Sequence, residues 1–219
     1  MAENERHSKA QEAEIIINPV RLAEAESYNV VRQFRKIAEM VECYLDPERP
    51  FKLRPSHIST LHREALQGIS PLAGLWRPSS VEIQGSRHRP PDAWEVAERV
   101  EELCDYVNDK WTDKKPLHLA SYVMWKLNWI HPFTDGNGRT SRAVSYMVLC
   151  IRLKTLLPGQ LTIPQQIELE KTPYYRALEA ADDAWDGGKI DLTAMKALLG
   201  AMLAKQLHAV YEESDTGGE

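Results

Sequence analysis

A glycine-containing loop between two helical segments is the strongest constraint that this sequence places on its fold. The segment before the loop, residues 116–130, carries apolar side chains at the spacing of one helix face, among them Leu119, Val123 and Leu127. The segment after it, residues 139–153, is also expected to be helical. Two helices joined by residues 131–138 are therefore predicted at the centre of the fold.

Most of the remaining chain also has helical spacing. Helices are expected over residues 21–45, 56–66, 93–108, 167–182 and 192–211, with a linker over residues 158–164. Residues 70–92 differ, because they are rich in proline and glycine and contain a short apolar–polar alternation. That alternation predicts a small hairpin within residues 81–91.

Nothing in the sequence divides the chain into two domains. There is no internal repeat, no low-complexity tract and no change of composition along its 219 residues. We predict a mainly α, single-domain helical bundle over residues 19–212, with an N-terminal extension (residues 1–18) and a disordered tail (residues 213–219).

Composition and charge exclude several classes of protein. The chain is 43% hydrophobic and 27% charged with a net charge of −5, which is typical of a globular protein and does not suit a nucleic-acid binder. Three separated cysteines indicate reduced thiols in a cytoplasmic setting. The longest apolar run is too short to cross a bilayer, and the polar N-terminus lacks a secretory signal.

Residues 131–142, His-Pro-Phe-Thr-Asp-Gly-Asn-Gly-Arg-Thr-Ser-Arg, combine the groups that phosphate chemistry needs. The glycines let a helix N-terminus approach an anion, and Asn137 can donate from its side-chain amide. Arg139 and Arg142 share one helix face and can clamp further phosphate oxygens, while Asp135 can hold Mg²⁺. The remaining group, His131, titrates near neutral pH and suits proton abstraction.

This stretch resembles the signature of the Fic family, and every fixed position of that signature is present. The resemblance extends to segments 61–63, 73–77 and 174–178, so that roughly residues 20–205 are similar to the family. It implies a protein adenylyltransferase that uses Mg²⁺ and ATP. Such an enzyme transfers AMP to a Ser, Thr or Tyr hydroxyl of a target protein and releases pyrophosphate.

The resemblance also implies a role for each matching residue. His131 would be the general base and Asp135 the Mg²⁺ ligand. The nucleotide would be bound by Gly136, Asn137, Gly138, Arg139 and Arg142, with Tyr174 or Tyr175 against the adenine. A target strand would dock on a flap formed by Val81, Glu82, Ile83, Gln84 and Gly85.

Three alternatives stay open. The Doc-type branch transfers a γ-phosphate and carries Lys where this chain has Gly138, so AMP transfer is favoured over phosphotransfer. An enzyme that removes AMP, or that uses another nucleotide, would need the same residues. A catalytically silent binding module would bind ATP or a partner without labelling anything.

Many Fic proteins carry an inhibitory helix with a glutamate followed by Gly or Asn. Two segments have its spacing, residues 8–12 and 60–64, but Ala13 and Ala65 follow their glutamates, Glu12 and Glu64. No candidate follows Gln206. Glu12 is thus only a degenerate candidate, and a separate small antitoxin-like protein, or no inhibitor at all, is favoured.

Overall fold

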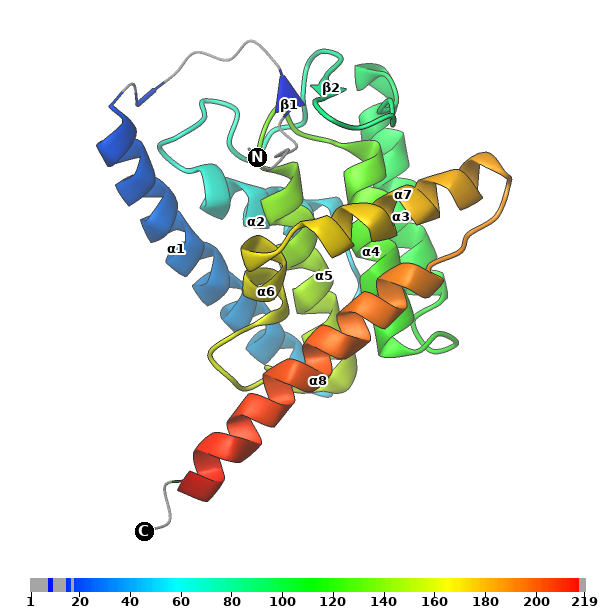
Figure 1. Cartoon of the computed structure of the whole chain (residues 1–219). Coiled ribbons are helices and arrows are strands. Elements are labelled where there is room, and N and C mark those ends of the chain that lie inside the picture. The colour runs from blue at the N-terminus through cyan, green and yellow to red at the C-terminus, as the bar shows by residue number, and fades with distance from the viewer. Residues whose placement is uncertain (1–7, 10–14, 17, 217–219) are drawn as a thin grey trace.

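The computed structural model describes residues 8–9, 15–16 and 18–216, and it is built almost wholly from helices (Figure 1). The elements, in chain order, are β1 (Ser8–Lys9), α1 (Pro19–Leu45), α2 (Pro55–Leu66), β2 (Glu82–Ile83), the 3-10 turn η1 (Ala93–Glu95), α3 (Val96–Asp109), α4 (Pro116–Ile130), α5 (Asn137–Leu153), α6 (Ile163–Leu169), α7 (Thr172–Asp186) and α8 (Thr193–Thr216). The predicted mainly α fold is confirmed.

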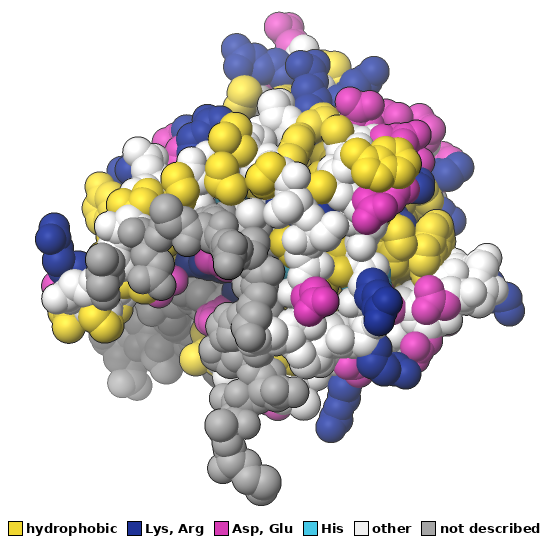
Figure 2. Space-filling model, turned by 90° about the horizontal axis from the view of Figure 1, so that it is seen from above, with side chains coloured by type: hydrophobic (Ala, Val, Ile, Leu, Met, Phe, Trp, Pro, Cys, Tyr) yellow, Lys and Arg dark blue, Asp and Glu magenta, His cyan; other side chains and the backbone are white. Residues whose placement is uncertain are grey.

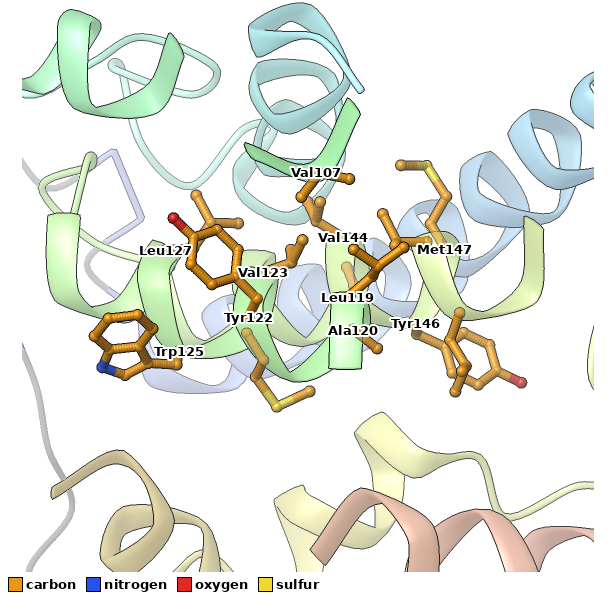
Figure 3. Close-up of a cluster of buried hydrophobic side chains, with 14 of the residues drawn as sticks. Val107, Leu119, Ala120, Tyr122, Val123, Trp125, Leu127, Val144, Tyr146 and Met147 are labelled. Atoms are coloured by element: carbon orange, nitrogen blue, oxygen red, sulfur yellow. The ribbon is translucent and has the colours of Figure 1, made fainter. Parts of the chain in front are cut away.

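Helices α4 and α5 form the centre of the bundle. Both are buried around most of their circumference, which differs from the one-sided burial of an amphipathic surface helix. Their contact is filled by Leu119, Val123, Val144 and Met147, with Val107 of α3 above them (Figure 3). The loop that joins these two helices is therefore anchored at both ends in the buried centre of the fold.

The outer helices cover this centre from several sides. Helix α1 is capped by Asn18, whose side chain accepts from the backbone N–H of Val20, and it buries Ile37 and Val41 against the core. Helices α7 and α8 pack together and cross in front of α4 and α5 in Figure 1, and the C-terminal part of α8 extends beyond the bundle.

The predicted helix over residues 167–182 is wrong, because the structure has two helices there. Helix α6 begins at Ile163, inside the predicted linker, and ends at Leu169. Pro173 explains the break, since it has no N–H to donate to the carbonyl of Leu169 and its ring would clash with that carbonyl in a continuous helix. The predicted disordered tail also differs, because α8 continues to Thr216. The remaining tail residues, 217–219, lie outside the described part.

The predicted hairpin within residues 81–91 is wrong as well. Only Glu82 and Ile83 form a strand, and their antiparallel partner is β1, with Ser8 opposite Ile83 and Lys9 opposite Glu82. The alternation in the sequence correctly located an extended segment. It could not reveal that the partner comes from the start of the chain.

We name residues 79–91 the flap. The face of the molecule that carries β1 and the flap is shown in Figure 2. On the part of this face that the structure describes, basic and acidic side chains are interspersed and form no continuous basic patch. Among the described helices, none is long and apolar enough to span a bilayer.

Candidate active site

Most of the residues singled out from the sequence meet in one pocket of about 560 Å³. Helices α1, α5, α6 and α7, the α4–α5 loop and the flap all contribute to its lining. The sequence-predicted residues that line it are Ile83, His131, Asp135, Gly136, Asn137, Gly138, Arg139, Arg142, Tyr174 and Tyr175. Of the five predicted flap residues, Ile83 alone is part of this lining, and the neighbouring flap residues Ser86 and His88 join it.

His131 ends helix α4 in a left-handed conformation, with φ 52° and ψ 58°. Its backbone N–H donates to the carbonyl of Leu127 at 2.9 Å, so it serves as the helix cap without a glycine. A non-glycine residue with positive φ is uncommon and carries strain, which active sites often hold.

The imidazole of His131 is only 6% exposed. Its Nδ1 lies 3.2 Å from the carbonyl oxygen of Asn128, which can only accept, so Nδ1 carries the proton and the neutral ring keeps its lone pair on Nε2. Burial lowers the pKa of His131 to about 4, an effect that the Asn128 hydrogen bond only partly offsets. At neutral pH the ring is therefore in the unprotonated form that a general base requires.

Asn137 folds the loop through its side chain. Its Oδ1 accepts from the backbone N–H of Phe133 at 2.9 Å, and its Nδ2 donates to the Phe133 carbonyl at 2.8 Å. The side chain is 3% exposed. The sequence suggested that this amide donates to a phosphate, and the structure shows that its oxygen and one of its N–H groups also fold the loop around Phe133. Asn137 lines the pocket, and its donation to a phosphate stays a prediction.

Gly136 is the N-cap of α5 and has φ 71°. A Cβ at this position would lie 2.5 Å from Cδ2 of Leu66 and 3.3 Å from Nε2 of His62, so both the backbone angle and the available space require glycine. Its close packing brings the first N–H groups of α5 to the pocket. These groups have no partner within the helix and point at an anion placed there.

The first motif arginine, Arg139, lies between two carboxylates. It donates to Oδ2 of Asp135 at 2.9 Å and to Oε1 of Glu26, on helix α1, at 3.2 Å. The side chains of Asp135 and Glu26 are 52% and 46% exposed. These ion pairs hold the guanidinium at the pocket wall and can be exchanged for phosphate oxygens at little cost.

The second motif arginine, Arg142, is more deeply buried and forms an ion pair with Glu168 of α6. Glu168 forms a second ion pair with Lys171, whose Nζ lies 2.8 Å from Oε1 of the glutamate. Burial alone would raise the pKa of Glu168, but Arg142 and Lys171 together hold it below its ordinary value. The arginine, the lysine and the glutamate all line the pocket.

The two predicted tyrosines have different environments. Tyr174 is 1% exposed, and its hydroxyl accepts from Nδ2 of Asn128 at 2.7 Å. Tyr175 is partly exposed at the pocket. Asn128 thus connects Tyr174 to His131, because the backbone carbonyl of Asn128 accepts from the imidazole.

A metal ion would find one carboxylate at the loop. Asp135 is half exposed beside the glycine cradle, and no group of three or more His, Cys, Asp or Glu side chains able to hold a metal occurs among the described residues. This donor set fits Mg²⁺, which protein sites often bind through one or two carboxylates together with substrate phosphates. It does not fit a closed structural metal site.

Sequence reasoning missed several residues of the site. Glu26, Glu168 and Lys171 carry no motif, and only their position in the folded chain brings them to the arginines. His62 carries no motif either, and it contacts the loop through the carbonyl of Asp135. Of the two inhibitory-helix candidates, Glu64 pairs with Arg32, away from both motif arginines, and Glu12 lies outside the described residues.

Comparison with known proteins agrees with this site. Residues 52–149, which include the whole loop and most of α5, match the sequence model of the Fic/DOC family. These residues form a Fic domain. The protein adenylyltransferase Fic of Drosophila willistoni is 32% identical to this chain over 128 residues, which is 58% of this chain and 24% of that protein. Protein adenylyltransferase fic-1 of Caenorhabditis elegans is 28% identical over 144 residues, 65% of this chain and 27% of the relative.

Solved structures show the same fold around the Fic domain. Fic-1 (residues 134–508) from C. elegans superposes with a TM-score of 0.67 at 22% identity, over 93% of this chain and 56% of that one. The BepC protein of Bartonella tribocorum, solved with bound AMPPNP, gives a TM-score of 0.53 at 16% identity, over 85% and 88% of the two chains. The chain spans about a quarter of the length of the curated relatives that it matches.

Proposed function

We propose that this chain is a protein adenylyltransferase, which transfers AMP from ATP to a hydroxyl side chain of a target protein and releases pyrophosphate. The observation that carries the proposal is the meeting of His131, the N-terminus of α5 and both motif arginines in one pocket that the flap borders. Relatives with about 30% identity are named protein adenylyltransferases, which supports the same activity here.

His131 acts as the general base of this reaction. Its Nε2 takes the proton from a Ser, Thr or Tyr hydroxyl as the hydroxyl oxygen attacks the α-phosphorus of ATP. The bond from that phosphorus to the bridging oxygen breaks, and pyrophosphate leaves. The Asn128 carbonyl supports this role, because it fixes the tautomer and the orientation of the ring.

The α5 N-terminus and the arginines bind the phosphates. The N–H groups at Gly138 and Arg139 face the anion, and Arg139 and Arg142 exchange their carboxylate partners for phosphate oxygens. Asp135 would hold Mg²⁺, which when bound neutralises phosphate charge. Tyr175, partly exposed in the pocket, and Tyr174 behind it are placed for the base of the nucleotide.

AMP transfer is favoured over γ-phosphate transfer by the space at Gly138. A Cβ built there would lie 3.3 Å from Nη1 of Arg142, so a larger side chain would displace this arginine. A glycine at this position therefore leaves Arg142 in place and leaves room beside the α5 N-terminus for a phosphate, which supports AMP transfer.

The target docks on the flap as an added strand. The pairing of β1 with β2 supports this partner, because it places an extended segment in antiparallel register on Glu82 and Ile83. Backbone pairing of this kind reads shape more than sequence, so targets can differ in their side chains. An antitoxin-like inhibitor remains a second partner of the proposal.

A cytoplasmic setting is part of the same proposal. All three cysteines are free thiols. Two of them, Cys104 and Cys150, are buried, and burial raises their pKa to about 12 and about 11. Such thiols are inert and consistent with a reducing compartment.

The label position in ATP tests the proposal. The purified chain is incubated with Mg²⁺, cell extract and ATP labelled at either the α- or the γ-phosphate. Protein labelling from the α-position alone is expected. Labelling from the γ-position would indicate phosphotransfer, and loss of label from pre-adenylylated protein without any gain would indicate the reverse reaction. No labelling and no removal, with nucleotide still bound, would indicate a binding module.

A further inference from the structure

Arg77 has a buried guanidinium whose three nitrogens donate to three different backbone carbonyls. Nε donates to His131 at 2.8 Å, Nη1 to Ser79 at 2.9 Å, and Nη2 to Pro91. The backbone N–H of Arg77 donates in addition to the carbonyl of Pro132 at 2.9 Å. The residue is 2% exposed, so these carbonyls replace the water that a charged group would otherwise need.

The first of these acceptors is the backbone carbonyl of His131, the proposed general base. His131 has positive φ, and its carbonyl is turned away from the ladder of α4 as a result. The Arg77 hydrogen bond satisfies this carbonyl, while the N–H of His131 is satisfied by Leu127. Arg77 thus holds the strained backbone that aims the imidazole into the pocket.

The other two acceptors lie at the two ends of the flap. Ser79 lies before β2. Pro91 lies after His88, which is the last residue of the flap that lines the pocket. Nε2 of His88 lies 2.7 Å from the carbonyl of Trp129, which provides one further attachment of the flap to α4. The guanidinium of Arg77 therefore binds both ends of the flap and the backbone of His131.

We propose that Arg77 is a positioning residue that sets the place of the target-docking flap relative to the His131 imidazole. It lines no part of the nucleotide pocket and acts only through backbone carbonyls. The expected effect of Arg77 on AMP transfer rests on the proposed function. Its effect on the flap does not depend on any activity.

The test compares Arg77→Lys and Arg77→Gln with Arg152→Lys. Arg152 is a matched control, because its Nε donates to a single carbonyl, that of Trp111, far from the flap. Amide hydrogen exchange should rise in both Arg77 variants over residues 80–90 and 131–134 and stay unchanged in α7 and α8. Unchanged exchange in the flap would overturn the proposal.

Transfer and binding are then measured on the same variants. A misplacement of about 1 Å can lower a rate by about 100-fold, so we expect Arg77→Lys to lower transfer to protein roughly 10- to 100-fold. The Kd for ATP should change less than about 2-fold. Chemical rescue of Arg77→Ala by added guanidinium, with no effect of guanidinium on Arg152→Ala, would separate positioning from general loss of packing.

The outcomes distinguish a failure of the proposed function from a failure of the role assigned to Arg77. A wild-type chain that transfers no AMP contradicts the proposed function, while the exchange experiment still decides the anchor. Transfer by Arg77→Lys at the wild-type rate would contradict the role of Arg77. A parallel loss of ATP binding, melting temperature and transfer in Arg77→Lys would show a purely structural role and would also overturn the inference.

Discussion

The ring of His62 lies flat against the ring of Phe133, with centroids 3.5 Å apart and an angle of 4° between the planes. His62 also accepts from the N–H of Gly74 at Nδ1, at 2.8 Å, and donates from Nε2 to the carbonyl of Asp135, at 3.0 Å. Burial lowers its pKa to about 4, so the ring is neutral and both of its nitrogens have fixed roles. Helix α2 thereby holds the middle of the α4–α5 loop.

Substitution of His62 should weaken nucleotide binding. His62→Phe keeps an aromatic ring against Phe133 but loses both hydrogen bonds, and a buried N–H and carbonyl left without partners cost about 1–3 kcal/mol each. His62→Gln keeps a donor near the Nε2 position and should retain more affinity. Titration with an ATP analogue and urea unfolding measure the two effects. Equal affinity of the wild type and the Phe variant would contradict the role of His62.

Gly136→Ala should cost more than Gly68→Ala. Both glycines have positive φ, 71° and 75°, but a Cβ at Gly68 meets nothing within 4 Å whereas one at Gly136 meets Leu66 at 2.5 Å. The left-handed backbone conformation alone costs an alanine about 1–2 kcal/mol of unfolding free energy relative to glycine. We expect Gly68→Ala to lose that amount of unfolding free energy and keep ATP binding, and Gly136→Ala to lose more and bind ATP poorly. Similar losses in the two variants would contradict the steric argument.

Glu26→Gln and Glu168→Gln should each raise the affinity for ATP. Their carboxylates pair with Arg139 and Arg142, the groups proposed to bind phosphates, and must be displaced when the nucleotide arrives. Both carboxylates are partly exposed, so each pair is worth at most about 1 kcal/mol, or roughly 5-fold in Kd. Glu98→Gln, an exposed site on α3, controls for the change in net charge. An affinity equal to that of this control would contradict the competition.

The nucleotide-free protein should lose stability as the pH falls below about 6.5. The folded-state pKa values of His62 and His131 are each about 4, while an unfolded chain has about 6.5. Between these values the unfolded chain binds more protons, so stability falls with pH, by roughly 3 kcal/mol for each histidine when the drop is complete. The lowered pKa values of His57 and His118 act in the same direction.

Urea unfolding at pH 7.5 and at pH 5 measures this dependence. His62→Phe should reduce the difference in unfolding free energy between the two pH values. His208→Asn, at an exposed site on α8, serves as the matched control. A pH difference that is the same in His62→Phe and in the wild type would contradict the assignment.

The sequence alone predicted the elements that depend on local patterns. The helices over residues 116–130 and 139–153 follow from apolar spacing, and Gly136 and the motif arginines follow from their spacing in the loop. Most of the exceptions involve contacts between distant parts of the chain. Pairing of β2 with Ser8 and Lys9, and of Arg139 with Glu26, depends on tertiary contacts that no periodicity records. The break between α6 and α7 is different, because Pro173 was visible in the sequence and was given too little weight.

Polar side chains that fold the loop were the hardest to interpret. The sequence marked Asn137 as a phosphate ligand but gave no sign that its side chain also folds the loop through two hydrogen bonds to Phe133. Arg77 and His62 lie 54 and 73 residues away from the loop residues that they contact. Their roles were accessible only from the folded structure.

If His131 is the base of AMP transfer, its removal should abolish transfer and leave ATP binding intact. Transfer of label from α-labelled ATP to protein is measured for the wild type and for His131→Ala, together with the Kd for ATP of both. We expect transfer to fall in the variant by a factor of at least about 100, within the range for general-base catalysis, while the Kd for ATP changes little. Normal transfer by His131→Ala would contradict the account.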